Sequence, residues 1–294
     1  MKDVTVRAYA KINLFLAVTG REANGYHTVE TVMQAISLSD RVMVAVDPDE
    51  PLLGHVSLTC SDPTLPCDGH NLAWRAAEAF ETLHPVSGCI RIHIEKQIPI
   101  AGGLAGGSTD AAAVLIGLNT LCGEPLDRDA LLSLGASLGA DVPFCILADS
   151  GVTAAQGYHF GERMLPLAPM PDCTVVLASS GESVSTPWAY GEIDRLPPDA
   201  VGCAAAFAEQ LRAGAPLDVL TDGMYNVFER AILPERPRAE ACLRILTDCG
   251  ARKAMMSGSG PTVFGLFSDE AQAQTAAAVL ELEGARTFTA KPIR

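Results

Sequence analysis

The chain has 294 residues, 48% of them hydrophobic and 19% charged, which provides enough apolar material for a sizeable core and argues against disorder. Its formal net charge of −14 argues against the basic surface that binding to nucleic acid needs. No apolar run approaches the roughly 20 residues of a membrane-spanning helix. Because the acidic chain repels anions as a whole, a phosphate site would have to be built locally, from backbone amides and a few cations.

The cysteines indicate a reducing compartment. All nine lie outside any CxxC pair, their number is odd, and the opening segment MKDVTVRAYAKINL does not look like a secretory leader. We therefore expect reduced, mostly buried thiols in a cytoplasmic protein. The expected partners are small molecules, without nucleic acid or membrane, and the expected assembly is a monomer or a homodimer.

The first element of the chain is an apolar strand that contains two polar residues. The segment AYAKINLFLAVTGREANGYHTVET (8–31) places alternate apolar residues on one face and Lys11 and Asn13 on the other. A lysine in such a run is usually a surface residue whose ammonium reaches water. Here it shares its face with Asn13 and is followed by a Gly-Tyr-His turn at 25–27.

Periodicity and capping signals predict the remaining elements. In chain order they are strand 41–46, a helix from the Asn71 cap to about His84, strand 89–98, a helix from Ser108 or Thr109 to about Leu121, a helix over 129–138, a hairpin within 150–167, strand 173–179, helices near 201–213, 222–232 and 237–249, strand 262–268, and a helix near 270–283. Pro166, Pro169 and Pro171 mark the expected linker between two α+β domains, 1–165 and 166–294.

The segment PIAGGLAGGSTDAAAVLIGLN (99–119) packs four glycines into six positions directly before a predicted helix. It matches neither GxxxxGK[ST] nor GxGxxG, so both common phosphate motifs are excluded. Glycine still permits positive φ and close backbone approach, and a helix N-terminus presents unsatisfied amides. The segment therefore predicts an anion cradle, with Ser108 or Thr109 as the helix cap and a hydroxyl there available to a phosphate-bound Mg²⁺.

Each of these segments has a plainer interpretation when taken alone. The glycine run is also compatible with a structural turn, although each glycine costs roughly 0.5–1 kcal/mol relative to alanine. Asp141 in SLGADVPFCI (137–146) is predicted to be a turn residue before a buried strand, and MMSGSGPTVFGLF (255–267) a tight loop that enters a strand. Asp110, in the first turn of its helix, is stabilised by the helix dipole and is assigned a structural role.

Taken in order, five segments resemble the GHMP family of small-molecule kinases over nearly the whole chain. They are AKINLFLAVTGREANGYHTVETV, PIAGGLAGGSTDAAAVLIGLN, LGADVPFC, VSTPWAYGEID and MSGSGPTVFGLF. The family usually carries Gly-Leu-Gly-Gly-Gly-Ser-Ser in the loop, whereas this chain has Ala105 and Thr109 in place of a glycine and a serine. Threonine keeps the hydroxyl, and Ala105 is tolerable if its φ is negative or its strain is modest.

The resemblance implies an α+β, two-domain GHMP kinase fold, with a ribosomal S5 domain 2-like N-terminal ATP-binding domain, a ferredoxin-like C-terminal substrate-binding domain, and an active site between them. It implies that Asp141 and Lys11 form the catalytic pair, and Ser108 is the candidate Mg²⁺ contact. The expected substrate contacts are Asn13, Tyr26, His27, Thr186 and Tyr190, the last preferred to Trp188 as the ring that covers one face of a cytosine. The residues assigned to ATP are Pro99, Ile100, Ala101, Gly102, Gly103, Leu104, Ala105, Gly106, Gly107, Ser108 and Thr109.

The implied reaction is transfer of the γ-phosphoryl group of ATP, with Mg²⁺, to the 2-hydroxyl of 4-(cytidine 5'-diphospho)-2-C-methyl-D-erythritol in non-mevalonate isoprenoid precursor synthesis. Asp141 is expected to accept the hydroxyl proton, and Lys11 to stabilise the developing alkoxide. Three alternatives stay open: another GHMP kinase acting on mevalonate, homoserine or a sugar; a non-catalytic S5-like RNA-binding or structural protein; and a nucleotide-binding regulator without turnover. The acidic charge opposes the second, and the presence of both Lys11 and Asp141 opposes the third.

Overall fold

The computed structural model describes residues 1–48, 56–197 and 203–294, which form two compact units. The first unit contains Met1–Ala10, Ser39–Ile98 and Ala105–Gly151, and the second contains Lys11–Leu38, Pro99–Leu104 and Val152–Arg294. Each unit therefore combines pieces from distant parts of the sequence. The chain passes from one unit to the other within two long strands, β1 (Lys2–Arg21) and β2 (His27–Asp47), and again within the glycine-rich loop.

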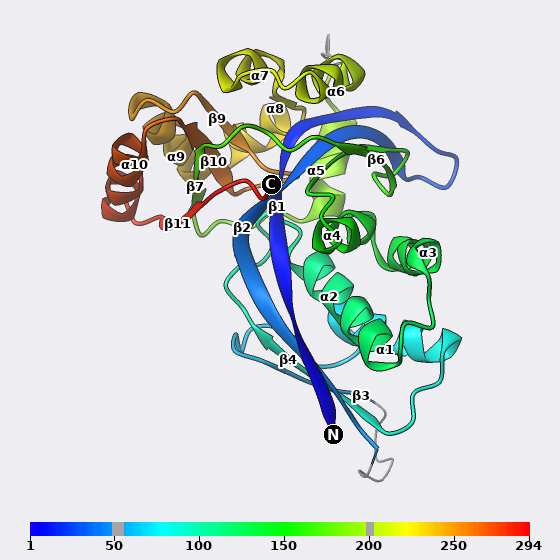
Figure 1. Cartoon of the computed structure of the whole chain (residues 1–294). Coiled ribbons are helices and arrows are strands. Elements are labelled where there is room, and N and C mark those ends of the chain that lie inside the picture. Colours follow the sequence, from blue (N-terminus) through cyan, green and yellow to red (C-terminus); the bar gives the residue numbers. More distant parts are fainter. Residues whose placement is uncertain (49–55, 198–202) are drawn as a thin grey trace. The chain divides into compact units, whose positions relative to one another are not determined.

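In the first unit, helices cover one face of a sheet (Figure 1). Strand β2 pairs antiparallel with β4 (Cys89–Glu95), which pairs in parallel with β3 (Val56–Cys60), so the strand order is β3-β4-β2-β1. Helix α2 contacts each of the other three helices of this layer and is therefore its centre. The four helices are α1 (Leu72–Leu83), α2 (Gly106–Leu121), α3 (Arg128–Leu138) and α4 (Val142–Asp149).

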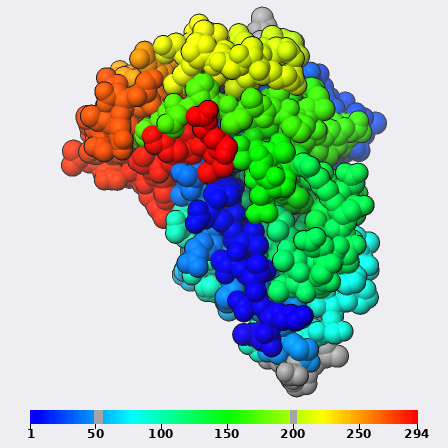
Figure 2. Space-filling model, viewed as in Figure 1, coloured from blue at the N-terminus to red at the C-terminus, as the bar shows by residue number. Residues whose placement is uncertain are grey.

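Buried and exposed side chains alternate along these strands, which explains why the helices cover one face of the sheet. Val42 and Val44 of β2, and Ile90, Ile92 and Ile94 of β4, are all buried beneath the helices. The first part of β1 alternates in the same way, with its outward side chains exposed, and this dark-blue segment lies open at the surface in Figure 2. Burial of one face of every strand is what orders the sheet against α2, which is itself buried on nearly all sides.

The second unit contains a four-stranded antiparallel sheet with strand order β11-β7-β10-β9. Helices α9 and α10 pack against it, and strands and helices follow one another as β-α-β-β-α-β, the ferredoxin-like arrangement expected for this half. The strands are β7 (Thr174–Ser179), β9 (Lys253–Met256), β10 (Val263–Phe267) and β11 (Arg286–Ala290), and the helices are α9 (Pro237–Asp248) and α10 (Glu270–Leu282).

The rest of the second unit surrounds the second half of β1 and the first half of β2. A hairpin of β5 (Ala154–Tyr158) and β6 (Arg163–Leu167) pairs with β2, and β8 (Tyr225–Asn226) pairs in parallel with β1. The short helices are α5 (Thr186–Ile193), α6 (Ala204–Arg212), α7 (Leu217–Gly223), α8 (Glu229–Ile232) and the 3-10 turn η1 (Leu233–Glu235). In the described ranges, no helix is both long and apolar enough to cross a bilayer, and no disulfide joins the nine cysteines.

Most elements predicted from periodicity are confirmed. Asn71 caps α1 as expected, because its Oδ1 accepts the Ala73 N–H over 3.0 Å. The strands expected at 41–46, 89–98, 173–179 and 262–268, the hairpin, and the helices at 129–138, 237–249 and 270–283 are all present within a few residues. The helix near 201–213 is α6, which begins at Ala204, and the first two predicted positions lie outside the described residues. The predicted α+β class is confirmed.

Two predicted elements are wrong. The segment after Asp141 is helix α4 and not a strand, because a short apolar run satisfies either element and Pro143 in the first turn favours a helix start. The helix expected near 222–232 is split: α7 ends at Gly223, β8 is extended beside β1, and α8 starts at Glu229. Asn226, at the break, is buried and bonds to a distant loop, a tertiary contact that no local pattern contains.

Candidate active site

Helix α2 begins two residues before Ser108, so the prediction that Ser108 or Thr109 caps it is wrong. The N-cap position is Ala105, and no side chain bonds to the first amides of the helix. The Thr109 N–H donates to the Ala105 carbonyl over 2.9 Å. Gly107 is exposed, and an ideal Cβ placed on it meets nothing within 4 Å. Uncapped amides beside open space are what an anion cradle at a helix N-terminus requires.

The loop before α2 stores backbone strain. Ala101 (φ 53°) and Ala105 (φ 61°) both lie in the left-handed region, which costs an L-residue other than glycine roughly 1–2 kcal/mol. The φ of Ala105 is therefore positive, and the substitution of alanine for the family's glycine leaves this strain in place. Between them, Gly103 has a φ of 75°, and an ideal Cβ on it would lie only 2.0 Å from the Ser257 carbonyl oxygen. Strained residues of this kind cluster at ligand-binding segments.

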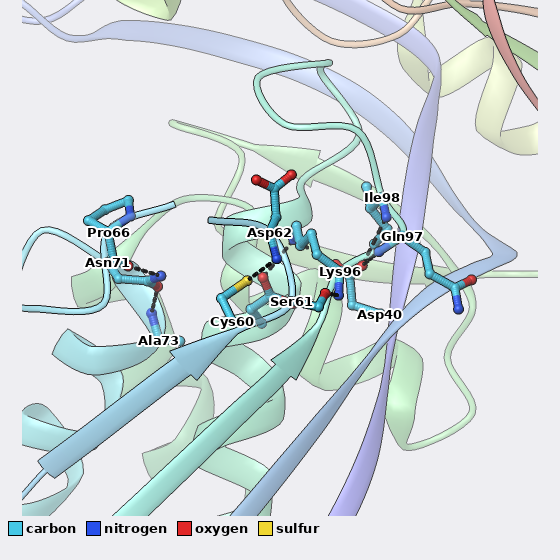
Figure 3. Close-up of polar contacts among 11 residues, drawn as sticks. Asp40, Cys60, Ser61, Asp62, Pro66, Asn71, Ala73, Lys96, Gln97 and Ile98 are labelled. Carbon is cyan, nitrogen blue, oxygen red and sulfur yellow. Dashed lines mark hydrogen bonds and ion pairs between the residues drawn. The ribbon is translucent and has the colours of Figure 1, made fainter. Parts of the chain in front are cut away.

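A buried ion cluster joins the residues on either side of this loop within the first unit. Lys96 Nζ lies 2.6 Å from Asp40 Oδ2 and 2.6 Å from Asp110 Oδ2, and all three side chains are at most 5% exposed. The other oxygen of Asp40 accepts the backbone N–H groups of Gln97 (2.5 Å) and Ile98 (2.8 Å), as Figure 3 shows. The cluster therefore fixes the chain before the loop to the beginning of α2.

The pKa values of two groups in this cluster are shifted. Burial lowers the pKa of Lys96, but the two carboxylates raise it more, so the net shift is upward and the ammonium stays charged. Burial is also the largest cause at Asp110; Lys96 opposes it, Asp40 adds to it, and the pKa of Asp110 rises to about 7. In the described part of the chain, Asp110 Oδ1 has no hydrogen-bond partner. The pairing with Lys96 agrees with the structural role predicted for Asp110.

Asp141 lies in a turn beside the start of α2. It occupies the N-cap position of α4, but its side chain does not bond to the amides of that helix. Helix α4 packs against α2, and an ideal Cβ on Gly139 would lie 4.0 Å from Ser108 Oγ. Ser108 is half-buried whereas Thr109 is buried. The first unit thus brings together the turn that carries Asp141, the Ser108 hydroxyl and the uncapped amides of α2.

In the second unit, Lys11 is buried and not the surface residue that a lysine in an apolar strand usually is. Its Nζ donates to Asn13 Oδ1 over 2.7 Å and to the Gly103 carbonyl over 3.1 Å. Its backbone N–H donates to the Leu104 carbonyl over 3.2 Å. Asn13 in turn donates to Thr31 Oγ1 over 2.8 Å. Lys11 and Asn13 therefore share a face of β1, as predicted. This face lies against Gly103 and Leu104, the last residues of the glycine loop in this unit.

The aromatic residues expected to bind a base lie in two separate pairs. The His27 ring stacks on Tyr190, with ring centroids 4.7 Å apart and an angle of 18° between the planes. Tyr26 is exposed and lies instead against Phe160, at a centroid distance of 5.5 Å. The stack on Tyr190 joins the Gly-Tyr-His turn after β1 to helix α5, and Phe160 is a neighbour that no sequence pattern indicated.

An acidic residue orients the His27 ring. Asp194, directly after α5, accepts a hydrogen bond from His27 Nε2 over 2.7 Å, and this bond is the main cause that lowers the pKa of Asp194. Arg21 donates to the other Asp194 oxygen over 3.1 Å, while its Nε donates to the Gly25 carbonyl over 3.1 Å. One guanidinium therefore ties the turn to the same carboxylate that holds the imidazole.

The two other residues predicted in this region have different partners. The Trp188 ring lies under the guanidinium of Arg236, 4.8 Å from the ring centroid. Thr186 Oγ1 lies 3.3 Å from the hydroxyl of Ser259, in the serine-glycine loop between β9 and β10. Trp188 is therefore engaged away from His27, whereas Thr186 contacts the loop that the sequence analysis singled out.

Comparison with known proteins shows which family the chain belongs to. Models of the GHMP kinase N-terminal and C-terminal domains match residues 71–149 and 201–285. A protein of Gloeobacter violaceus named 4-diphosphocytidyl-2-C-methyl-D-erythritol kinase is 41% identical, covering 99% of this chain and 95% of its own length. A protein of the same name from Acaryochloris marina is 37% identical, covering 96% and 92%. The chain belongs to the GHMP kinase family.

Solved structures are also similar to this chain over nearly its whole length. A crystal structure of 4-(cytidine 5'-diphospho)-2C-methyl-D-erythritol kinase matches with a TM-score of 0.77 and 33% identity, covering 98% of each chain. Homoserine kinase from Cytophaga hutchinsonii matches with a TM-score of 0.70 at 18% identity, covering 99% of this chain and 95% of that one. The second likeness shows a shared fold alone.

Sequence reasoning missed several neighbours of the predicted site residues in this GHMP kinase. Lys96 and its partner Asp40 had one signal, a charged residue directly before a glycine run, but its partners are distant in the chain. Asp194 lies within the matched segment VSTPWAYGEID, where a carboxylate near an aromatic residue was visible. Ser257 had no signal apart from its place in a glycine-rich loop, because its function depends on a contact with Gly103.

Proposed function

We propose that this GHMP kinase transfers the γ-phosphoryl group of ATP to the 2-hydroxyl of 4-(cytidine 5'-diphospho)-2-C-methyl-D-erythritol in non-mevalonate isoprenoid precursor synthesis. The observation that carries the proposal is similarity over the full length: the relative that is 41% identical over 99% of the chain bears the name of that kinase. The likeness to homoserine kinase, at 18% identity, concerns the fold. The segment 1–165 is proposed as the ATP-binding domain, which also contributes Asn13, Tyr26 and His27 to the acceptor site, and 166–294 as the substrate-binding domain, in a cytoplasmic protein.

The phosphates of ATP are proposed to lie against residues 99–109. Amides at the start of α2 lack a side-chain cap, so they are available to an anion, and the helix dipole adds a partial positive charge there. The open space beside Gly107 lets a ligand approach the backbone. Positive φ at Ala101 and Ala105 supports a loop held in a binding shape by its surroundings.

When Mg²⁺ is bound with ATP, it neutralises part of the negative charge of the phosphates. Ser108 fits this ion, because its hydroxyl is a hard oxygen donor, half-buried in the first turn of α2. Within the described residues, no group of three His, Cys, Asp or Glu side chains is placed to hold a metal. We propose Ser108 as the contact from this chain to that ion.

Asp141 and Lys11 are proposed to act on the same phosphoryl group. Asp141 accepts the proton of the acceptor hydroxyl, and Lys11 stabilises the negative charge that develops on the oxygen. Support comes from each unit: the turn of Asp141 runs beside Ser108 at the start of α2, and Lys11 contacts Gly103 and Leu104.

The acceptor is proposed to be recognised through its cytosine by the turn at Tyr26 and His27. The ring of Tyr190 is the favoured platform, because it already stacks on His27 while Trp188 is engaged elsewhere. Stacking of a base on an aromatic ring contributes about 1–3 kcal/mol. Thr186 is proposed to contact the same ligand from the start of α5.

Asn13 is proposed to orient the reacting hydroxyl together with Lys11. Its side chain accepts a hydrogen bond from Lys11 and donates one to Thr31, so its amide plane is held on both sides. A fixed amide next to the ammonium supports a function in alignment.

The test is a coupled ADP-release assay with the cytidylated acceptor, mevalonate and homoserine in parallel. Of the three acceptors, we expect only the cytidylated one to be turned over. In the Lys11→Ala variant we expect kcat to fall about 100-fold or more. Preference for mevalonate or homoserine would overturn the substrate assignment. ATP binding without turnover on any of the acceptors would point instead to a nucleotide-binding regulator.

A further inference from the structure

The carbonyl oxygen of Gly103 is shared by two buried donors. Lys11 Nζ donates to it over 3.1 Å, and Ser257 Oγ donates to it over 3.0 Å. Both donor side chains are buried, and Ser257 is fully so. The proposed mechanism gives Lys11 a role in the chemistry but leaves Ser257 without one, although its hydroxyl bonds to the same acceptor as the catalytic ammonium.

Two backbones in close contact hold the segments that carry this carbonyl and Ser257 against each other. An ideal Cβ on Gly103 would lie 2.0 Å from the Ser257 carbonyl oxygen, and one on Gly258 would lie 2.9 Å from the Gly103 carbonyl oxygen. Only glycine allows the two segments to approach so closely. A carbonyl oxygen has two lone pairs, so with Ser257 on one of them the other is directed to Lys11.

The segment that carries Ser257 is itself anchored by two side chains that are largely buried. Asn226 Nδ2 donates to the Met256 carbonyl over 2.7 Å and to the Gly258 carbonyl over 2.9 Å. Glu229 accepts the Met256 N–H over 2.7 Å. Ser257 therefore stands between two clamped neighbours, and its hydroxyl has little freedom to move.

We infer that Ser257 is a positioning residue for Lys11, acting through the Gly103 carbonyl, and that Asn226 holds Ser257 in place. An ammonium carries three tetrahedral N–H donors, and the bonds of two of them to Asn13 and Gly103 orient the group. The inference rests on the proposed function, in which Lys11 faces the reacting oxygen. A misplacement of about 1 Å at such a group can lower the rate about 100-fold.

The same contact links catalysis to the nucleotide loop. Gly103 belongs to the loop proposed to bind ATP, so the orientation of Lys11 depends on the conformation of that loop. Removal of the Ser257 hydroxyl loosens the peptide plane of Gly103 and affects Lys11 first. The expected signature is a fall in kcat that exceeds any change in the KM for ATP.

The experiment is steady-state kinetics of Ser257→Ala with ATP and the cytidylated acceptor. We expect kcat to fall about tenfold or more while the KM for ATP changes less than about threefold. The matched control is Ser180→Ala, which removes a hydroxyl that is equally buried in the same unit and bonds to Glu182 over 3.1 Å. The control is expected to keep kcat within about twofold.

A double-mutant cycle separates positioning from general damage. If Ser257 acts through Lys11, Ser257→Ala costs less than about twofold in the Lys11→Ala background, measured as single turnover with excess enzyme. The same fold loss in both backgrounds, or normal turnover of Ser257→Ala beside an inactive Lys11→Ala, would overturn this inference alone. Full activity of Lys11→Ala would overturn the proposed function as well.

A second variant keeps the test valid if Ser257→Ala does not fold. Ser257→Cys keeps nearly the same volume and replaces the hydroxyl with a weak donor. Thermal unfolding is measured for both variants. We expect Ser257→Cys to fold and to show a kcat between those of the wild type and the alanine variant, and wild-type kcat in a folded Ser257→Cys would overturn the inference.

Discussion

Lys96 and Asp110 form a buried ion pair, with 2.6 Å between Nζ and Oδ2, that connects the residue after β4 to the first turns of α2. Asp40 shares the same ammonium and also holds two backbone amides that lead into the glycine loop. The pair therefore lies where the loop leaves the first unit and where it returns. Its loss is expected to affect both stability and the loop.

Lys96→Met is expected to destabilise the protein by about 3–5 kcal/mol, because it leaves two buried carboxylates without a counter-charge. Urea unfolding followed by circular dichroism measures the effect. The matched control is Arg41→Ala, which breaks the exposed pair between Arg41 and Glu95 and should cost less than about 1 kcal/mol. Equal losses for the two variants would contradict the prediction.

The free energy of unfolding of Asp110→Asn, measured relative to that of the wild type, is expected to increase as the pH rises from 5 to 8. Burial raises the pKa of Asp110 to about 7, so the folded state holds a proton that the unfolded state releases near pH 4. The wild type therefore loses stability through this window, by about 1–4 kcal/mol, and the asparagine variant does not. Unfolding free energies at both pH values test this, with the exposed Asp129→Asn as the control. A difference between wild type and Asp110→Asn that is the same at both pH values would contradict it.

Gly107→Val and Gly106→Val are expected to differ in stability while both lose ATP binding. A Cβ on Gly107 meets no protein atom within 4 Å, so only the approach of the ligand is blocked and the fold stays intact. A Cβ on Gly106 would lie 3.1 Å from Lys96 Nζ and 3.2 Å from Ile98 Cγ2, so this variant also loses thermal stability. Calorimetric titration with ATP and a melting curve measure both. Gly191→Val, in open space on α5, is the control, and unchanged ATP affinity of Gly107→Val excludes the cradle.

Asp141→Asn is expected to lower kcat about 100-fold or more, because an amide cannot accept the proton of the acceptor hydroxyl. Folding and ATP affinity should stay near those of the wild type, because asparagine has nearly the same size and shape as aspartate. Asp149→Asn, at the other end of the same helix, is the matched control and should keep most of its activity. Near-normal turnover of Asp141→Asn would refute its assignment as the base.

Asp194→Ala is expected to raise the KM for the cytidylated acceptor about five- to tenfold and to leave the KM for ATP unchanged, because His27 loses a hydrogen bond that contributes about 1 kcal/mol. The kinetic constants for the two substrates are measured separately. Glu192→Ala removes a half-buried carboxylate near the end of α5, where it pairs with Arg195, and serves as the control. An equal rise in both KM values would argue against orientation of His27 by Asp194.

The sequence predicted the elements and motifs that depend on local rules. Alternation at 41–46 and 89–98 indicated strands, Asn71 indicated a cap, and both proved correct, because side-chain period and capping are set within a few residues. The start of α2 and the helical state of α4 were missed. At the start of α2 the signal is Ala105, which has a positive φ, and at α4 it is a short apolar run after Asp141. Each of these local signals is compatible with more than one backbone conformation.

By itself the sequence determined the fold class, the family and the polar face of β1 that carries Lys11 and Asn13, since these follow from periodicity and from the order of motifs along the chain. Only the tertiary structure decided that Lys96 bridges two aspartates, that Asp194 orients His27, and that Ser257 and Lys11 bond to one carbonyl. Hydrogen bonds and ion pairs act over about 3 Å in space without regard to separation in sequence, so no spacing in the chain encodes them.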